Sequence, residues 1–273
     1  MPSDGGKRLR SLYSASGGVG EVFASKVDDY AAARPSYPPQ LFEFLRSVVG
    51  VNQGARVADV GAGTGLFTTG LLHLGYEVLA VEPSEGMRRA ADARLGGVPG
   101  YSSAHGCAEA MPLPDGSVDL VTAAQAFHWF DTERARAEFL RVLKPGGRVA
   151  LVWNDRVLAD PLHGALDEVF TAFGGRKRQA LVTHEADRDL RGFFGSCLPA
   201  ELHWPHAQFL TEDGLQDLAF SRSYMPGRDT APGRRAAQAL VQVFQRFAEG
   251  GTVAVRYTAR AFVGRPRADG GAR

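Results

Sequence analysis

The segment V-A-D-V-G-A-G-T-G at residues 57–65 limits the possible folds of this chain more than any other stretch. A short apolar run leads into it, and its three glycines stand at alternate positions. Glycine allows a sharp backbone turn and a close approach of a ligand to the main chain. An apolar helical pattern follows, and a second apolar run, V-L-A-V-E, ends at Glu82. This order predicts a strand, a tight loop, a helix and a second strand that ends in an acidic residue.

The acidic residue after the second strand indicates an adenosine-containing cofactor, because a carboxylate at this place accepts the hydroxyl groups of a ribose. A dinucleotide-binding loop would have the spacing G-x-G-x-x-G, whereas the glycines here stand at 61, 63 and 65. Asp59 precedes them, where it would repel a pyrophosphate and attract a cation. S-adenosylmethionine has a sulfonium and an ammonium group and no phosphate, so the sequence favours it. A glycine-rich turn in an unrelated α/β domain is the alternative.

Charge and composition narrow the function classes. The net charge is +1 at pH 7, so the chain has no overall attraction for nucleic acid. The two cysteines, Cys107 and Cys197, have neither metal-ligand spacing nor a disulfide framework, which fits a reducing cytoplasm. The N-terminus lacks the apolar segment of a signal peptide, and no apolar stretch is long enough to span a membrane. We expect a cytoplasmic protein without a bound metal or membrane association, and the sequence leaves its oligomeric state open.

Strands and helices alternate through the first part of the chain. The expected strands lie at residues 55–60, 77–82, 101–104, 117–123 and 148–154, and the expected helices at 64–74, 84–95 and 131–143. K-P-G-G at 144–147 reads as a turn, and an earlier helix begins at Ser36 or Tyr37 and ends at Gly50. The alternation predicts an α/β fold with a doubly wound, mostly parallel sheet, which binds ligands at the carboxyl ends of its strands.

The pattern is less regular after Asn154. Helices are expected over residues 160–173 and 233–249, and strands over residues 203–210 and 252–263. The strands would form an antiparallel pair that completes a seven-stranded, Rossmann-like sheet. Residues 174–200, between the first of these helices and the first of these strands, have mixed polarity, and R-K-R at 176–178 is interpreted as a solvated loop. Residues 1–50 are expected to form an N-terminal tail with a helical cap, and residues 51–154 the cofactor-binding core. Residues 155–273 are expected to form a lid insertion and the last strands of the same domain.

Seven segments carry a family resemblance. They are Y-A-A-A-R-P-S-Y-P (30–38), V-A-D-V-G-A-G-T-G (57–65), C-A-E-A-M-P-L-P-D-G-S-V-D (107–119), A-A-Q-A-F-H-W-F-D (123–131), L-K-P-G-G (143–147), S-R-S-Y-M (221–225) and V-R-Y-T-A-R (255–260). Together they resemble the methyltransferase type 11 group of class I S-adenosylmethionine-dependent methyltransferases, and more narrowly its trans-aconitate methyltransferase-like branch. The glycine segment is general to class I enzymes, whereas R-P-S-Y-P and F-H-W-F-D are narrower. Members of the branch methylate many small molecules, so the resemblance does not identify the acceptor.

The resemblance implies a set of residues that bind the cofactor. Asp59 would meet the ammonium group of S-adenosylmethionine, directly or through water, and Glu82 would accept both ribose hydroxyls. Arg34 would neutralise the carboxylate of the cofactor, with a structural arginine in a turn as the alternative. The other residues implied to bind the cofactor are Gly61, Ala62, Gly63, Pro83, Met87, Ala108, Glu109, Ala124 and Gln125.

The acceptor side of the site is expected around His128, which directly follows the fourth strand. A hydroxyl or amine acceptor must lose a proton, and His128 is the candidate base. A histidine that only fixes the loop is the alternative reading. Trp129, Tyr30 and Tyr224 are expected either to form the wall of the acceptor pocket or to pack within the protein.

The sequence therefore predicts methyl transfer from S-adenosylmethionine to a small-molecule acceptor by in-line displacement. The acceptor atom could belong to a carboxylate, a hydroxyl, an amine or a carbon, and alignment would supply much of the rate increase. An RNA or protein methyltransferase would favour a basic face, against the balanced charge of this chain. A regulatory cofactor-binding protein or a cyclase without methyl transfer stays open, because binding residues do not prove chemistry.

Overall fold

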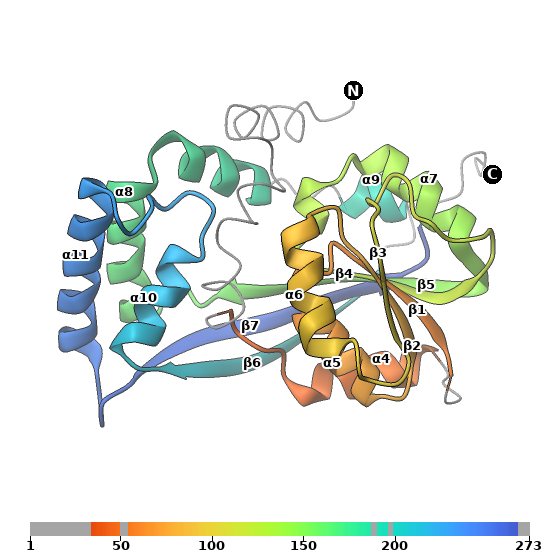
Figure 1. Ribbon diagram of the computed structural model, residues 1–273, viewed down its shortest axis with the longest axis horizontal. Helices are drawn as coiled ribbons and strands as arrows, with labels where there is room; N and C mark the ends of the chain where they lie inside the picture. Colours follow the sequence, from red (N-terminus) through yellow and green to blue (C-terminus); the bar gives the residue numbers. More distant parts are fainter. Residues whose placement is uncertain (1–33, 50–53, 187–189, 196–198, 267–273) are drawn as a thin grey trace.

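The computed structural model describes residues 34–49, 54–186, 190–195 and 199–266. In these residues seven strands form one sheet in the order β3-β2-β1-β4-β5-β7-β6 (Figure 1). The strands are β1 (Arg56–Val60), β2 (Glu77–Val81), β3 (Tyr101–Ala104), β4 (Val118–Ala124), β5 (Leu143–Arg156), β6 (Ala200–Leu210) and β7 (Val253–Gly264). The prediction of a seven-stranded, doubly wound sheet is confirmed.

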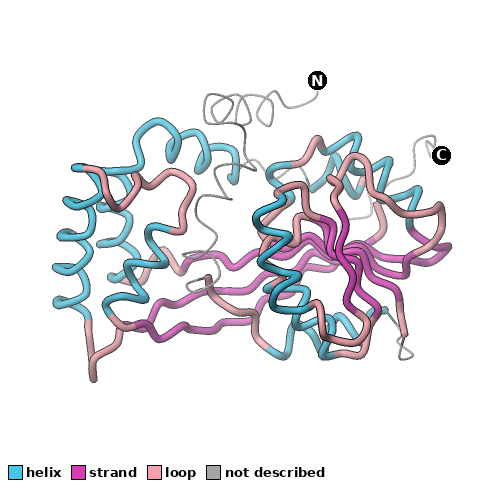
Figure 2. The backbone as a smooth tube through the Cα atoms, viewed as in Figure 1, coloured by secondary structure: helices cyan, strands magenta, loops and turns pink. Residues whose placement is uncertain are grey.

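The first five strands are parallel, and β7 runs antiparallel to both β5 and β6. Parallel strands are normally covered on both faces, which explains their nearly continuous apolar sequences. Ala58 in β1, Val121 in β4 and Leu151 in β5 are accordingly fully buried. Figure 2 shows helices on both sides of this parallel part of the sheet.

The helices of the described residues are α4 (Pro39–Val49), α5 (Leu66–His73), α6 (Glu85–Leu95), α7 (Thr132–Val142), α8 (Pro161–Ala186), α9 (Leu190–Phe194), α10 (Glu212–Phe220), α11 (Ala231–Phe247) and the 3₁₀ helix η1 (Phe127–Trp129). Asp131, Thr211 and Thr230 precede α7, α10 and α11, and each side chain accepts a backbone N–H three residues further on. The prediction that Asp131 caps a helix is confirmed. No helix in this part of the chain is long and apolar enough to cross a bilayer.

Three buried apolar clusters hold the described elements together. One contains Leu41 and packs α4 and α5 against one face of the sheet. A second contains Phe139 and packs α7 and α9 against the other face. The third contains Phe170 and joins α8, α10 and α11 to the far ends of β6 and β7, as Figure 1 shows. The long strands β5, β6 and β7 therefore connect the parallel core to a separate helical layer.

Two predicted boundaries are wrong in the first half of the chain. Helix α4 begins at Pro39 rather than at Ser36 or Tyr37. A residue before proline avoids the helical conformation, so the chain stays extended until the last proline of Y-P-P. The turn expected at residues 144–147 lies within β5, where it forms a bulge between the pairs Val118–Leu143 and Leu120–Arg148.

The region after residue 173 is more ordered than expected. R-K-R belongs to α8, which is interrupted at Gly175 (φ +54°), and the Arg178 guanidinium lies 2.6 Å from Asp167 Oδ1. The expectation of a loop is therefore wrong, although Arg176 is exposed to solvent as expected. Phe193 and Phe194 bury α9 in the core, and α10 was not expected at all. Residues 1–33, which include Tyr30, lie outside the described residues.

Helices α4 and α5 meet where Gly70 lies against the ring of Phe42. A Cβ atom at Gly70 would lie 2.1 Å from Phe42 Cζ. The Phe42 ring is held by Phe67, with 5.1 Å between ring centroids, and by Tyr37, with 6.4 Å. Because α5 continues from the glycine segment, this contact also fixes the position of that segment.

We expect Gly70→Ala to destabilise the protein by about 1–3 kcal/mol, the usual range for an overpacked core. Helix propensity alone would favour alanine by roughly 0.5–1 kcal/mol. The matched control is Gly164→Ala in α8, where nothing lies within 4 Å of the added Cβ, and this variant should gain that propensity term. Urea denaturation measures both free energies of unfolding, and equal stabilisation of the two variants would contradict the packing argument.

Candidate functional site

A cleft lies at the carboxyl ends of β1, β4 and β5. Six residues that the sequence implied for cofactor binding are part of its lining: Arg34, Asp59, Gly61, Ala62, Ala124 and Gln125. Ligands of doubly wound sheets bind at this edge, because the loops there leave a crevice between diverging helices. These six residues, which the sequence analysis assigned to cofactor binding, therefore lie around one cleft in the folded chain.

Asp59 is buried at the end of β1, with 1% of its surface exposed. Its Oδ2 accepts a hydrogen bond from Thr68 Oγ1 (2.6 Å), and its Oδ1 accepts one from Thr122 Oγ1 (2.8 Å). Burial raises the pKa of Asp59 to about 6, and the two hydroxyl hydrogen bonds oppose this rise. The carboxylate is therefore charged at neutral pH in a poorly solvated place, where a cationic ligand group would be stabilised.

The glycine segment turns with positive φ at each glycine: +68° at Gly61, +56° at Gly63 and +75° at Gly65. Only glycine adopts this conformation without strain. A Cβ at Gly61 would also come within 2.6 Å of Ala126 Cβ. The N–H of Gly61 donates to the carbonyl of Val81 (2.8 Å), so the loop is attached to the end of β2.

Glu82 fixes the same loop through its side chain. Its Oε2 accepts the N–H of Gly63 and its Oε1 the N–H of Ser84, both at 2.9 Å. Burial raises the pKa of the Glu82 carboxyl, while the hydrogen bonds from Ser84 and Gly63 lower it. The sequence did not predict this internal role. Each carboxylate oxygen has a further lone pair, so Glu82 can support the loop and still accept a hydrogen bond from a ligand.

Gln125 has a strained backbone at the end of β4. Its φ of +56° is positive, which among the described residues no other non-glycine residue shows. Its N–H donates to the carbonyl of Val152 (2.8 Å), and its Nε2 donates to the carbonyl of Asn154 (3.3 Å). These bonds hold the turn after β4 against β5, so that Gln125 lines the cleft.

Asn154 is a site residue that the sequence analysis missed. Its Nδ2 donates to the carbonyls of Pro35 (3.4 Å) and Ser36 (3.3 Å), and its Oδ1 lies 2.9 Å from His206 Nε2. The segment that contains Arg34 is thereby held beside β5. The position of Asn154 at the end of an apolar strand was the available signal, because such strand ends form the ligand edge.

The remaining residues implied to bind the adenosine lie outside the lining of this cleft. Met87 and Ala108 are each 2% exposed, and Pro83 is exposed. Glu109 Oε1 accepts the N–H of Asp131 (2.6 Å), which supports the start of α7. Contacts of these four residues with an adenine stay predictions.

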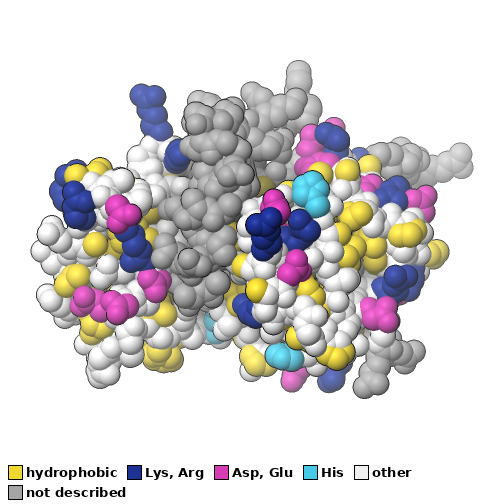
Figure 3. Space-filling view, in the orientation of Figure 1, with side chains coloured by type: hydrophobic (Ala, Val, Ile, Leu, Met, Phe, Trp, Pro, Cys, Tyr) yellow, Lys and Arg dark blue, Asp and Glu magenta, His cyan; other side chains and the backbone are white. Residues whose placement is uncertain are grey.

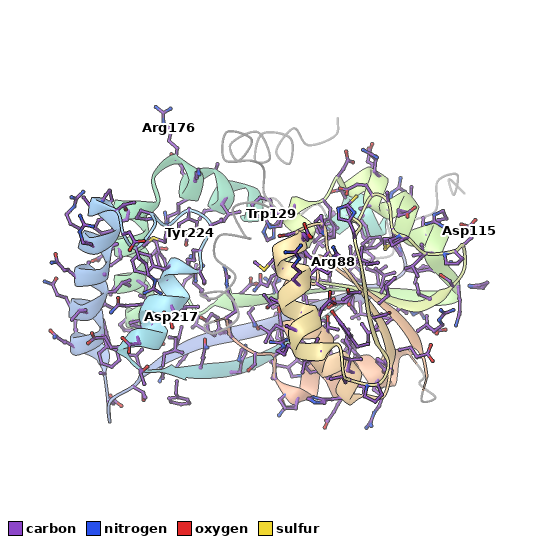
Figure 4. All side chains as sticks on the ribbon, in the orientation of Figure 1. Arg88, Asp115, Trp129, Arg176, Asp217 and Tyr224 are labelled. Carbon is purple, nitrogen blue, oxygen red and sulfur yellow. The ribbon has the colours of Figure 1, made fainter. Side chains whose placement is uncertain are left out.

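Three of the expected acceptor-side residues, His128, Trp129 and Tyr224, are not part of the lining. His128 lies in η1 and is 9% exposed, with its ring centroid 5.1 Å from that of Trp129. Tyr224 is 8% exposed and packs against Phe170, with 5.9 Å between centroids. Figure 4 shows Tyr224 beside α10 and Trp129 nearer to α6. Packing explains the position of Tyr224, and the roles of His128 and Trp129 stay predictions.

The chemistry of the cleft fits S-adenosylmethionine. The amino-acid part of this cofactor carries an ammonium and a carboxylate, and the lining supplies Asp59 and Arg34 for them. Outside this lining, Glu82 has the chemistry to accept a ribose diol, and the buried Met87 and Ala108 have the chemistry to pack on an adenine. In the described ranges, no three His, Cys, Asp or Glu side chains gather as ligands for a metal ion.

Comparisons with known proteins agree with this fit. Residues 58–151 match the family model described as a methyltransferase domain. An uncharacterized methyltransferase of Mycobacterium tuberculosis is 37% identical over 226 residues, which cover 83% of this chain and 85% of the relative. The malonyl-[acyl-carrier protein] O-methyltransferase of Methylococcus capsulatus is 46% identical over 111 residues, 39% of this chain and 40% of that one. A solved structure described as a type II methyltransferase from Anaeromyxobacter dehalogenans is 28% identical, with a TM-score of 0.59 over 84% of this chain and 96% of that one.

The raised pKa of Asp59 leads to a prediction on the stability of the unliganded protein. The folded protein binds this proton more tightly than the unfolded chain, whose pKa is 3.8, because the folded value is about 6. The contribution of Asp59 to the free energy of unfolding is therefore greatest below pH 3.8 and is lost as the pH rises through about 6. Asp59→Asn should flatten this part of the pH profile, as measured by urea denaturation.

Asp59→Asn should also remove a pH dependence of cofactor affinity, which runs opposite to the pH dependence of stability. Affinity for S-adenosylhomocysteine should rise as the pH increases through about 6 in the natural protein, because Asp59 gains its charge there. In Asp59→Asn the affinity should be lower at neutral pH and independent of pH in this window. Asp115→Asn is the control, since Asp115 is exposed, is not part of the cleft lining and is labelled at the right-hand edge of the molecule in Figure 4. Calorimetric affinities that do not differ between Asp59→Asn and the control would contradict the assignment.

Proposed function

The chain belongs to the S-adenosylmethionine-dependent methyltransferases, and we propose that it transfers the methyl group to a small-molecule acceptor. The observation that carries the proposal is the cleft itself. Its lining contains the acidic Asp59 together with Arg34, Arg156, Arg222 and Tyr257. A concave site with a few convergent polar groups is typical of small-molecule recognition.

Different residues of this chain are proposed to bind different parts of the cofactor. Asp59 would bind the ammonium group and Arg34 the carboxylate, while Glu82 would accept the ribose hydroxyls. Ala62 and Gly63 would approach the methionine part through their backbone, with Ala124 and Gln125 across the cleft. S-adenosylmethionine supplies an activated methyl group on a sulfonium when it is bound. The protein then has to orient the acceptor and exclude water.

The need for a base depends on the acceptor. A carboxylate is already a nucleophile, whereas a hydroxyl or an amine must lose a proton. His128 is the residue proposed to accept that proton, and Trp129 beside it is proposed to contact the acceptor. The segments R-P-S-Y-P and F-H-W-F-D support membership of the trans-aconitate methyltransferase-like branch. The name of the Methylococcus capsulatus relative describes an O-methyltransferase, which supports an oxygen atom as the acceptor.

A macromolecular acceptor is less well supported. Figure 3 shows basic and acidic side chains interspersed over the visible face rather than gathered in one basic area. The net charge of +1 agrees with this distribution. RNA recognition relies on an extended positive surface, so these observations favour a small molecule.

The proposal is tested by the release of S-adenosylhomocysteine in the presence of a panel of acids, phenols, amines, RNA and protein. We expect release with at least one small molecule, and none with RNA or protein. Gly63→Val should abolish both binding and release while the helical circular dichroism persists, because valine is strained at a φ of +56°. Tight cofactor binding without release on any acceptor would instead identify a binding protein.

The role of His128 is tested by comparing acceptor classes. On a hydroxyl acceptor, His128→Asn should lower turnover by about 10²–10⁴, with a smaller loss at high pH where the acceptor ionises unaided. On a carboxylate acceptor, turnover should change little. Cofactor affinity, measured by calorimetry, should be nearly unchanged in both cases. Natural kinetics on every acceptor would assign His128 a purely structural role.

A further inference from the structure

Arg156 and Arg222 bring two guanidinium groups to the cleft from distant parts of the chain. Arg156 ends β5, and Arg222 follows α10. Both lie over the ring of Phe170, with their Cζ atoms 6.0 Å and 4.7 Å from its centroid. Since both line the cleft and share one aromatic ring, they form a common positive end of the site.

Two acidic groups of the described residues near these arginines are already engaged in ion pairs. Asp167 Oδ1 lies 3.1 Å from Arg156 Nη1 and 2.6 Å from Arg178 Nη2, so one carboxylate serves two guanidinium groups. Asp155, which also lines the cleft, pairs with Arg260 at 3.0 Å. Like charges that are partly buried repel one another unless an anion joins them. This end of the cleft therefore favours an anionic ligand.

Tyr257 adds a buried donor beside these arginines. It is the register partner of Arg156 on β7, and it lines the cleft with 3% of its surface exposed. Within the described residues, its hydroxyl has no hydrogen-bond partner. The ring is held in place by His206, stacked at 5.6 Å, and by His163 at 5.7 Å. Buried hydroxyls are nearly always bonded, so this one indicates a ligand that accepts its proton.

The charge state of Tyr257 suits a donor. Burial raises the pKa of Tyr257, although the positive charges of Arg222, Arg34 and Arg156 lower it in part. The hydroxyl therefore keeps its proton at neutral pH and faces the three arginines. A phenolic O–H beside guanidinium groups is a suitable donor set for a carboxylate, which accepts several hydrogen bonds at once.

We propose that Arg156, Arg222 and Tyr257 form a subsite for a carboxylate of the methyl acceptor. This inference rests on the proposed function and narrows it to acids of small size. Arg34, the residue proposed for the cofactor carboxylate, donates to the carbonyl of Ser221 (3.3 Å), next to Arg222 in the sequence. Two carboxylates, one from each ligand, would thus be held by neighbouring arginines.

The test measures citrate binding to the complex with S-adenosylhomocysteine. At constant ionic strength, citrate should raise the melting temperature of the natural protein more than chloride does. Arg222→Gln and Tyr257→Phe should each weaken citrate affinity about tenfold or more, the range for hydrogen bonds to a charged group. Their affinity for S-adenosylhomocysteine should stay within about twofold of the natural value. Arg235→Gln, at an exposed position of α11, is the matched control and should bind citrate normally.

Tyr257→Phe keeps the test independent of misfolding. Because the hydroxyl has no partner in the described part of the chain, its removal should leave the protein without citrate equally or more stable. Equal melting temperatures in citrate and chloride, or normal citrate affinity in both variants, would overturn the proposal. A loss of S-adenosylhomocysteine affinity with normal citrate binding would assign the subsite to the cofactor. Since no turnover is measured here, failure to methylate any small molecule would refute the proposed function while leaving the citrate result intact.

Discussion

The buried carboxylate of Asp59 connects three elements on which the site depends. It stands at the end of β1 and accepts hydrogen bonds from Thr68 in α5 and Thr122 in β4. The strand, the helix after the glycine loop and the neighbouring strand are thereby held at one point. Glu82 completes this arrangement, because its two oxygens fix the N–H groups of Gly63 and Ser84. A loop that would otherwise have freedom at each glycine is fixed by two carboxylates, which leaves a shaped edge for a ligand.

The second half of the site depends on the last strand rather than on the parallel core. β7 inserts antiparallel between β5 and β6, and its register sets Tyr257 opposite Arg156. Both strands extend beyond the parallel part of the sheet and carry the layer of α8, α10 and α11. That layer brings Arg222 to the cleft, and Asn154 brings the Arg34 segment to β5. The binding site is therefore assembled where the two parts of the chain meet.

Local signals explain what the sequence could predict. The apolar runs that become β1, β2 and β4, the glycine loop and the cap at Asp131 depend on residues within a few positions of one another. The missed features depend on distant contacts. The local sequence around Arg178 indicates a solvated loop, but in the folded chain Arg178 pairs with Asp167. Phe193 anchors α9 because it packs against Phe127 and Phe139. Arg222 and Tyr257 lie within the segments that carry the family resemblance, yet only the register of β7 and the packing of α10 show that they line one cleft.

The charged and polar groups that line the cleft give a physical reason why ligands would stabilise this fold. The hydrogen bonds to Asp59 within the described residues come from neutral hydroxyls, so folding buries its charge without a cationic partner. Elsewhere in the lining, Arg156 shares Asp167 with Arg178, and the buried Tyr257 hydroxyl has no hydrogen-bond partner within the described residues. Both arrangements are unfavourable in the unliganded protein, and a ligand of opposite charge relieves each of them. An ammonium bound at Asp59 and a carboxylate bound at Arg156, Arg222 and Tyr257 would therefore gain binding energy from the same desolvation that the fold imposes on these side chains.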